Sequence, residues 1–353
     1  MTTVTMSRGT FPLYLLTLVA SVAFCEYAGL AAGRGALLVT LVFWTALLQG
    51  AVAAAAVADL TGARWIHLVR RQLLAASPLL LLPPILLLLL APRLDLYPWS
   101  AEPGAWLNGP FFLLRNLVLL LGVYAAGRWY ARCALRSDAQ TPRSAIVYLF
   151  AFVVAQTLVA FDLVMSLEYP WLSTLFGAYF FVEALYAGLA LAGVLAFILP
   201  RRDPDELPAA EGSPRWDIGM LLFGFSVLWG GLFFAQYLLL WYGNLPEEVQ
   251  FIARRLESLP TRALAVAFLL ANFFVPFFGL LGKWAKRSAA AVGTVSMLVL
   301  AGLFSERLFF ILPVVPLPVG ILLAQNALLL AFWLLTVHSR EQLLPPAVER
   351  LPE

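Results

Sequence analysis

The sequence predicts an all-α integral membrane protein with about ten transmembrane helices. Of its 353 residues, 62% are hydrophobic and only 12% are charged, and the mean hydropathy is +0.88. A soluble domain carries about 25% charged residues, so most of this chain must face lipid or other buried apolar surface. The second observation is the regular recurrence of apolar runs of about 20 residues, the length that crosses a bilayer as a helix.

The ten apolar runs follow one another with short polar breaks between them. They are 11–32, 35–59, 74–91, 110–131, 145–166, 171–200, 218–242, 261–282, 289–307 and 317–337. The first follows a basic flank without an A-x-A cleavage site, so we expect a retained helix. The third contains Pro78, Pro83 and Pro84, which predict a kink. The ninth ends at the charged pair Glu306 and Arg307.

Three segments between or after the helices have a character of their own. Residues 62–73 form a short basic amphipathic stretch, which is typical of a membrane interface. Residues 243–260 predict a short helix, because Pro246 suits its first turn and Arg254 and Arg255 suit its end. Residues 201–216 lack periodicity and predict a linker, and 338–353 form a polar tail.

The distribution of positive charge predicts the orientation in the membrane. In a ten-helix topology, 16 of the 23 Lys and Arg residues lie on the side that holds both termini, and 7 lie on the other side. Cytoplasmic loops carry the excess of Lys and Arg. Both termini and the linker 201–216 are therefore expected in the cytoplasm.

Two carboxylates, Asp162 and Glu183, lie within apolar runs on either side of a short polar break. A charged group at membrane depth costs about 2.5–3.5 kcal/mol on insertion scales and usually faces a bundle interior or a water-filled path. Glu183 lies about 12 residues into its run, which is a depth of roughly 17 Å. Tyr179, Glu183 and Tyr186 share one helix face, so the tyrosines could hydrogen-bond the carboxyl group or relay a proton.

Three further residues extend this candidate proton-transfer set. Glu26 lies beside Tyr27 in the first run, and Asp59 ends the second run. Arg115 opens the fourth run and could pair with Asp162, and such an ion pair would keep Asp162 ionised and unable to carry a proton. Two interpretations stay open: carboxylates at several depths that serve two half-channels, or polar contacts that lock helices together.

Cysteine and histidine are too few to bind a redox group. Cys25 and Cys133 belong to no CxxC or CxxCH pattern, and the only histidines are His67 and His338. This composition lacks iron–sulfur, zinc and c-type haem signatures. The sequence therefore predicts no metal site, no cofactor and no catalytic redox centre in this chain.

Several motifs resemble those of a known family. They are LTGARWIHLVRR, WLNGPFFLLRN, FDLVMSLEYPWLSTLFGAYFF and DIGMLLFGFSVLWGGLFFAQYLLLWYGNLPEE. They are similar to the NrfD/polysulfide-reductase-type membrane subunits, and among these to the F-type subunits (ActF) of alternative complex III, over residues 35 to 290. The resemblance implies two four-helix bundles, helices 2–5 (35–166) and helices 6–9 (171–307), flanked by helices 1 and 10.

The resemblance also implies a function. Such a chain is a cofactor-free subunit of a quinol:cytochrome c, or other high-potential carrier, oxidoreductase in the bacterial inner membrane. Its partners are membrane lipid, a C-type quinol-binding subunit, an iron–sulfur subunit and haem subunits, which hold the quinol, the iron–sulfur clusters and the haem c. F-type subunits are proposed to offer proton half-channels, which by analogy makes Asp162 and Glu183 candidates.

This sequence departs from the family in two ways, and two other functions remain open. Its loop 92–109 is short and its membrane core lacks histidine, so no quinone-binding residue is assigned. One alternative is a purely structural scaffold subunit. The other is a secondary transporter, which would show helices interrupted at matching places in two repeats, whereas only the third run is interrupted.

Overall fold

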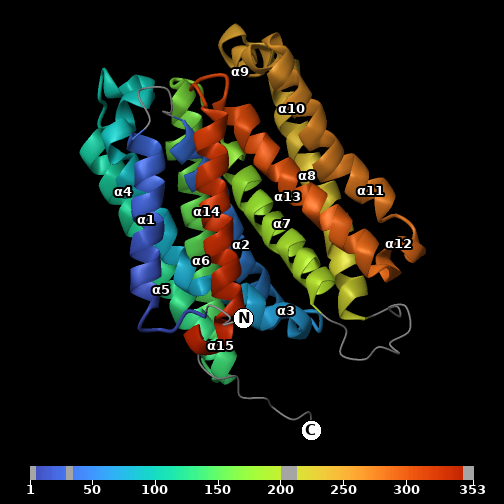
Figure 1. The fold of residues 1–353 in the computed structure, drawn as a ribbon. Helices are drawn as coiled ribbons and strands as arrows, with labels where there is room; N and C mark the ends of the chain where they lie inside the picture. The colour runs from blue at the N-terminus through green and yellow to red at the C-terminus, as the bar shows by residue number, and fades with distance from the viewer. Residues whose placement is uncertain (1–4, 29–34, 200–212, 345–353) are drawn as a thin grey trace.

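The computed structural model describes residues 5–28, 35–199 and 213–344, and its regular structure in these ranges is entirely helical (Figure 1). Nine of the described helices are long and apolar enough to cross a membrane. Their bounds are Ala36–Thr61, Ile66–Leu96, Gly109–Arg136, Thr141–Glu168, Leu175–Ile198, Pro214–Gly243, Leu259–Gly279, Ala289–Ile311 and Val319–His338. α1 (Phe11–Tyr27) is a shorter apolar helix of 17 residues. The prediction of an all-helical, multi-pass membrane protein is confirmed.

Six of the spans are unbroken α-helices close to the predicted runs. They are α2 (Ala36–Thr61), α5 (Gly109–Arg136), α7 (Leu175–Ile198), α8 (Pro214–Gly243), α13 (Ala289–Ile311) and α14 (Val319–His338). Several predicted boundaries are wrong. α7 begins at Leu175 and not at 171, and α13 continues through Glu306 and Arg307 to Ile311. α5 continues to Arg136 and not to 131, and α8 begins at Pro214, within the predicted linker 201–216. The ninth run can continue because both charged side chains are buried inside the protein.

The third span is interrupted where the prolines predict it. It consists of α3 (Ile66–Leu74), η1 (Ser77–Leu81), α4 (Leu82–Leu90) and η2 (Ala91–Leu96), followed by the short η3 (Pro98–Ser100). Pro78 and Pro83 stand in the first two positions of η1 and α4, where a missing N–H is tolerated. α3 corresponds to the predicted amphipathic stretch and buries its apolar side.

Two other spans contain π-helical segments that the sequence analysis did not predict. α6 (Thr141–Leu158) passes into the π-helix η4 (Val159–Val164) and then into η5 (Met165–Glu168). α10 (Leu259–Leu269) passes into the π-helix η6 (Leu270–Phe274) and then into α11 (Val275–Gly279). π-Segments inside α-helices are frequent at functional sites. Each of these two carries a buried polar residue, Asp162 in η4 and Asn272 in η6.

Short helices mark the two ends of the molecule. α9 (Pro246–Glu257), the short helix predicted within residues 243–260, lies at one end of the long helices. α3, α12 (Lys283–Arg287) and α15 (Arg340–Leu343) lie at the opposite end (Figure 1). These are called the α9 end and the α3 end below.

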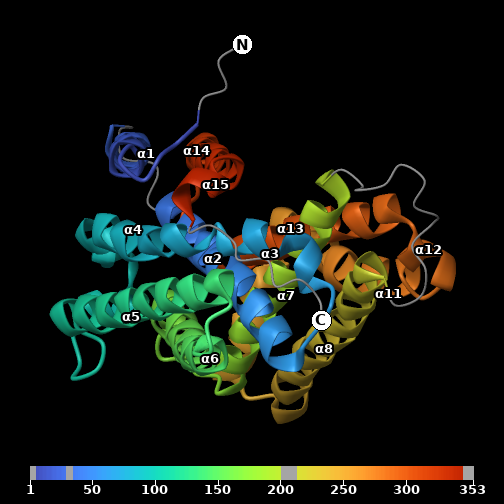
Figure 2. The same ribbon diagram turned by 90° about the horizontal axis from the view of Figure 1, so that it is seen from below.

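α2 and α7 cross at the centre of the molecule (Figure 2). The crossing point is formed by Gly50 of α2 and Gly188 of α7, where a Cβ atom on either glycine would overlap backbone atoms of the other helix. α2 also packs against α4, α5 and α6, and α7 packs against α8 and α13. This close approach is possible only because both crossing residues lack a side chain.

Candidate functional site

The candidate site is a buried cluster of acidic and basic side chains between α7 and α13. Nη2 of Arg307 lies 2.5 Å from Oε2 of Glu183. The neighbouring residue Glu306 also faces inward, and its carboxyl group interacts with that of Glu183. All three residues are at most 1% exposed, so water does not screen their charges.

Neutral polar groups surround the second carboxyl group. The hydroxyl of Tyr179 donates to Oε1 of Glu306, and Nδ2 of Asn272 lies 3.4 Å from its Oε2. The hydroxyl of Tyr186 donates to the backbone carbonyl of Asn272 at 3.2 Å. These contacts form a polar chain through the protein interior from Tyr186 through Asn272 and Glu306 to Tyr179.

The cluster holds two carboxyl groups but one guanidinium. Leaving a buried charge without compensation is expensive, and two neighbouring carboxylates disfavour their joint ionisation. The arrangement is electrically balanced when the two acids together hold one proton. Three buried atoms of the cluster, Oε1 of Glu183, Nη1 of Arg307 and Oδ1 of Asn272, have no hydrogen-bond partner within the described chain. Of these atoms, only the carboxylate oxygen of Glu183 can take up a proton.

Tyr179, Glu183 and Tyr186 do not form the hydrogen bonds that were predicted for this helix face. All three are buried on α7, but neither tyrosine bonds to Glu183. Glu183 also lies only eight residues after the start of α7, which is about 12 Å along the axis instead of the expected 17 Å. Glu306, Arg307 and Asn272 are site residues that were not predicted from the sequence. The apolar turn LFFI after the Glu306–Arg307 pair was the available signal, since it continues the span.

Asp162 belongs to a separate cluster near the α9 end. Nε and Nη2 of Arg115 each lie 2.8 Å from its Oδ2, and Nδ2 of Asn116 donates to the same oxygen at 2.8 Å. The guanidinium of Arg115 stacks on the ring of Trp106 at 4.1 Å. The predicted ion pair between Arg115 and Asp162 is thus formed, and one carboxylate is balanced by one guanidinium. Among the described contacts, none joins Asp162 to Glu183.

The other two predicted acids are also paired with arginine. Oε1 of Glu26 lies 3.9 Å from Nε of Arg93, and Gln325 donates to its Oε2 at 2.9 Å. Asp59 forms an ion pair with Arg70 and accepts from the hydroxyl of Tyr130 at 2.7 Å. In the described ranges, Glu306 is thus the one fully buried acid without an arginine of its own.

α9 is attached to the spans by a further ion pair. Arg255 is buried and pairs with Glu168 at the end of η5, and it donates to the carbonyl of Phe310 at 2.8 Å. Burial lowers the pKa of Arg255 to about 10, an effect that Glu168 opposes, so the guanidinium keeps its charge at neutral pH. The contact fixes α9 over η5 and the α9 end of α13.

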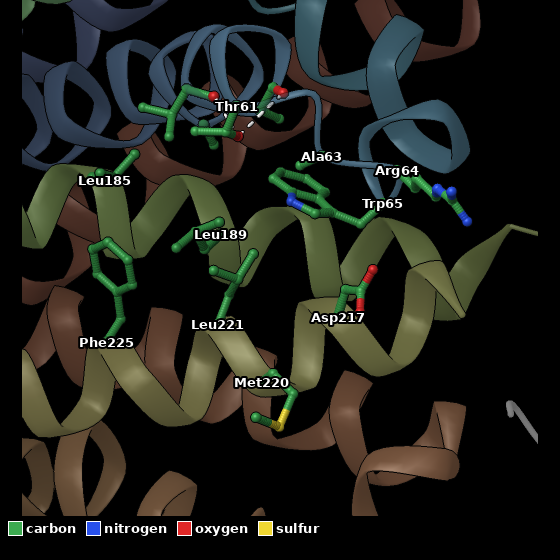
Figure 3. A pocket seen from close by; sticks show the side chains of 13 residues that line it. Thr61, Ala63, Arg64, Trp65, Leu185, Leu189, Asp217, Met220, Leu221 and Phe225 are labelled. Carbon is green, nitrogen blue, oxygen red and sulfur yellow. Dashed lines mark hydrogen bonds between the residues drawn. The ribbon is translucent and has the colours of Figure 1, made fainter. Parts of the chain in front are cut away.

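A cavity of about 390 Å³ lies between α2, α7 and α8 at the α3 end (Figure 3). Trp65, Arg64 and Asp217 lie at one end of it, and Leu185 and Phe225 lie at the other (Figure 3). The ring of Phe225 stacks on that of Tyr186 at 6.1 Å. One aromatic ring therefore separates the cavity from the polar chain that leads to Glu306.

No protein-family model matches the chain, and no curated protein matches it. Within the described ranges, no group of three or more His, Cys, Asp and Glu residues is arranged to hold a metal ion. The fold and composition define a multi-pass helical membrane protein, and the cluster defines a buried ionisable centre within it.

Proposed function

We propose that this chain is a cofactor-free membrane subunit of a bacterial quinol:electron-acceptor oxidoreductase of the alternative complex III type, and that it conducts protons. The observation that carries the proton-conducting role is the buried cluster with two carboxyl groups and one guanidinium. A purely structural ion pair needs one acid for each base. The additional acid, Glu306, gives the site a proton to exchange.

The proposed setting is the bacterial inner membrane. Ten helices cross it, with both termini in the cytoplasm, and spans 2–5 and 6–9 form two four-helix bundles flanked by spans 1 and 10. α2 packs against α4, α5 and α6, and α7 packs against α8 and α13, as this division requires, while α2 and α6 also pack against α7 between the two bundles. A C-type quinol-binding subunit, an iron–sulfur subunit and haem subunits complete the complex and carry its quinol, iron–sulfur clusters and haem c.

The proposed proton route has two parts that meet at the cluster. From the α3 end, water in the 390 Å³ cavity brings protons towards Tyr186 and Asn272. Glu306 and Glu183 hold one proton between them, and Arg307 stabilises whichever carboxyl is ionised. Towards the α9 end, the hydroxyl of Tyr179 is the next polar group in the described contacts.

Glutamine substitution tests the conducting role. Glu306→Gln keeps the volume and the contacts to Tyr179 and Asn272 but removes titration. We expect the variant complex to assemble, to oxidise quinol and to move fewer protons per electron in liposomes. Asp162→Asn is the matched control, because Asp162 is a buried acid in a balanced pair and its loss should leave the ratio unchanged. An unchanged ratio in assembled Glu306→Gln complex would show that the cluster does not conduct.

A scaffold role is the second candidate, and the pairing of the other acids favours it. Glu26, Asp59 and Asp162 each have an arginine partner, as locked contacts between helices require. A scaffold subunit would tolerate Glu306→Gln without a change in coupling. Co-purification of haem-bearing subunits in mild detergent separates both candidates from a stand-alone transporter, which would purify without them.

A further inference from the structure

Four arginines gather around one cavity at the α3 end, away from the acid cluster. The cavity has a volume of about 300 Å³. Arg128, Arg132 and Arg136 lie four residues apart on one face of α5, and Arg8 approaches from the start of α1. The remaining lining is largely apolar and comprises Phe11, Pro78, Tyr124 and Leu343.

Two of these guanidinium groups, those of Arg8 and Arg128, are held by neutral oxygen atoms of the protein. Arg8 donates to the backbone carbonyls of Leu343 and Leu344 at 3.2 and 2.9 Å, and Nη1 of Arg128 lies 3.0 Å from Oγ of Ser77. No ion pair to an acid involves any of the four within the part of the chain that the structure describes. Like charges this close repel one another.

Other arginines at the same end of the molecule do have acidic partners. Arg70 pairs with Asp59, and Nη2 of Arg71 lies 2.7 Å from Oε2 of Glu341. The four arginines that line the cavity differ from Arg70 and Arg71 in lacking such a partner among the described residues. A bound anion would relieve the repulsion between the arginines. Because the lining is both basic and apolar, the anion should carry apolar groups as well as negative charge.

We propose that this cavity binds the headgroup of an anionic phospholipid with two phosphates, of the cardiolipin type. Arginine's fork of N–H donors matches phosphate oxygens, and basic pockets between transmembrane helices at the cytoplasmic side bind such headgroups. The cavity lies at the end of the long apolar helices, the level at which headgroups lie. α1 and α5, which both border the cavity, also carry exposed apolar side chains such as Leu16 and Val118, which suit acyl chains. This site is independent of the proposed proton route.

Lipid titration of the purified protein, with any subunits that accompany it, tests the proposal. Native mass spectrometry in mild detergent would compare cardiolipin, phosphatidylglycerol, phosphatidylcholine and inorganic phosphate. We expect tight binding of cardiolipin, weaker binding of phosphatidylglycerol and none of the other two. Equal binding of phosphatidylglycerol would overturn the assignment of two phosphates, and binding of phosphatidylcholine or of phosphate alone would overturn the lipid assignment.

A double variant locates the site. Arg132→Gln with Arg136→Gln removes two exposed guanidinium groups, and we expect cardiolipin binding to weaken about thirtyfold. Arg143→Gln is the matched control, since Arg143 is an exposed arginine near the start of α6 that does not line the cavity. Unchanged melting temperatures establish that the variants fold. Unchanged cardiolipin affinity in the folded double variant would refute the site.

Discussion

Replacement of Arg307 is the most informative test of the buried cluster of Glu183, Glu306 and Arg307. Arg307→Met keeps most of the side-chain volume and removes the single guanidinium. Glu183 and Glu306 would then face each other without a cation, in a site where the Glu183 and Arg307 side chains are at most 2% exposed. Removing one partner of a buried ion pair costs about 3–5 kcal/mol, because the remaining charge is left uncompensated. With a typical folding stability of about 5–15 kcal/mol, we expect a severely destabilised protein.

A second substitution should restore much of this loss. Glu183→Gln with Arg307→Met removes the acid that Arg307 neutralises and leaves Glu306 with its neutral partners, Tyr179 and Asn272. We expect the double variant to be more stable than Arg307→Met alone, with an interaction energy towards the upper part of the range of about 0.5–3 kcal/mol seen for coupled residues. Arg143→Met, at an exposed position, is the control and should be nearly neutral.

Reversible unfolding in mixed detergent micelles would measure the four corners of this cycle. The interaction energy between the two positions is the quantity of interest, because effects of each substitution that are independent of the other position cancel in the cycle. An interaction energy near zero would refute the argument that Glu183 and Arg307 form a coupled buried pair.

Three other predictions concern packing, the second acid cluster and orientation. Gly50→Ala should destabilise the protein by about 3 kcal/mol or more, since its Cβ would overlap the backbone of Ala184. Gly122→Ala, in open space on α5, is the control and should be neutral or stabilising in thermal unfolding. Equal effects of the two substitutions would contradict the described α2–α7 crossing. Asp162→Asn should lower the free energy of unfolding by about 1.5–3 kcal/mol, less than Arg307→Met, because the Arg115 guanidinium keeps its contacts with Trp106; no measurable loss would contradict the ion pair. Ser213→Cys should react with an impermeant thiol reagent only after the membrane is opened, because the charge bias puts it in the cytoplasm; labelling in intact spheroplasts would reverse the orientation.

The sequence by itself determined the class of fold and the position of most helices. Apolar length is a local property, and a run of about 20 residues must form its backbone hydrogen bonds internally in lipid. For that reason α2, α5, α8 and α14 lie close to their predicted ranges. The broken third span was also predictable, because Pro78 and Pro83 impose it locally. Pairing of Asp162 with Arg115 was foreseen as one of two outcomes, since a short connection makes their helices neighbours.

Only the tertiary structure decided which acids act together. Glu183 and Arg307 are more than a hundred residues apart in sequence, and no periodicity relates α7 to α13. From the sequence alone, the charged pair Glu306–Arg307 predicts the end of a membrane span. The span can continue only where other parts of the protein supply compensating charges, and these partners are known only from the tertiary structure. The partners of Tyr179 and Tyr186 were equally hidden, since a helix face fixes the direction of a side chain but not what it meets. The extra acid at the centre of the molecule is therefore a property of how the helices pack.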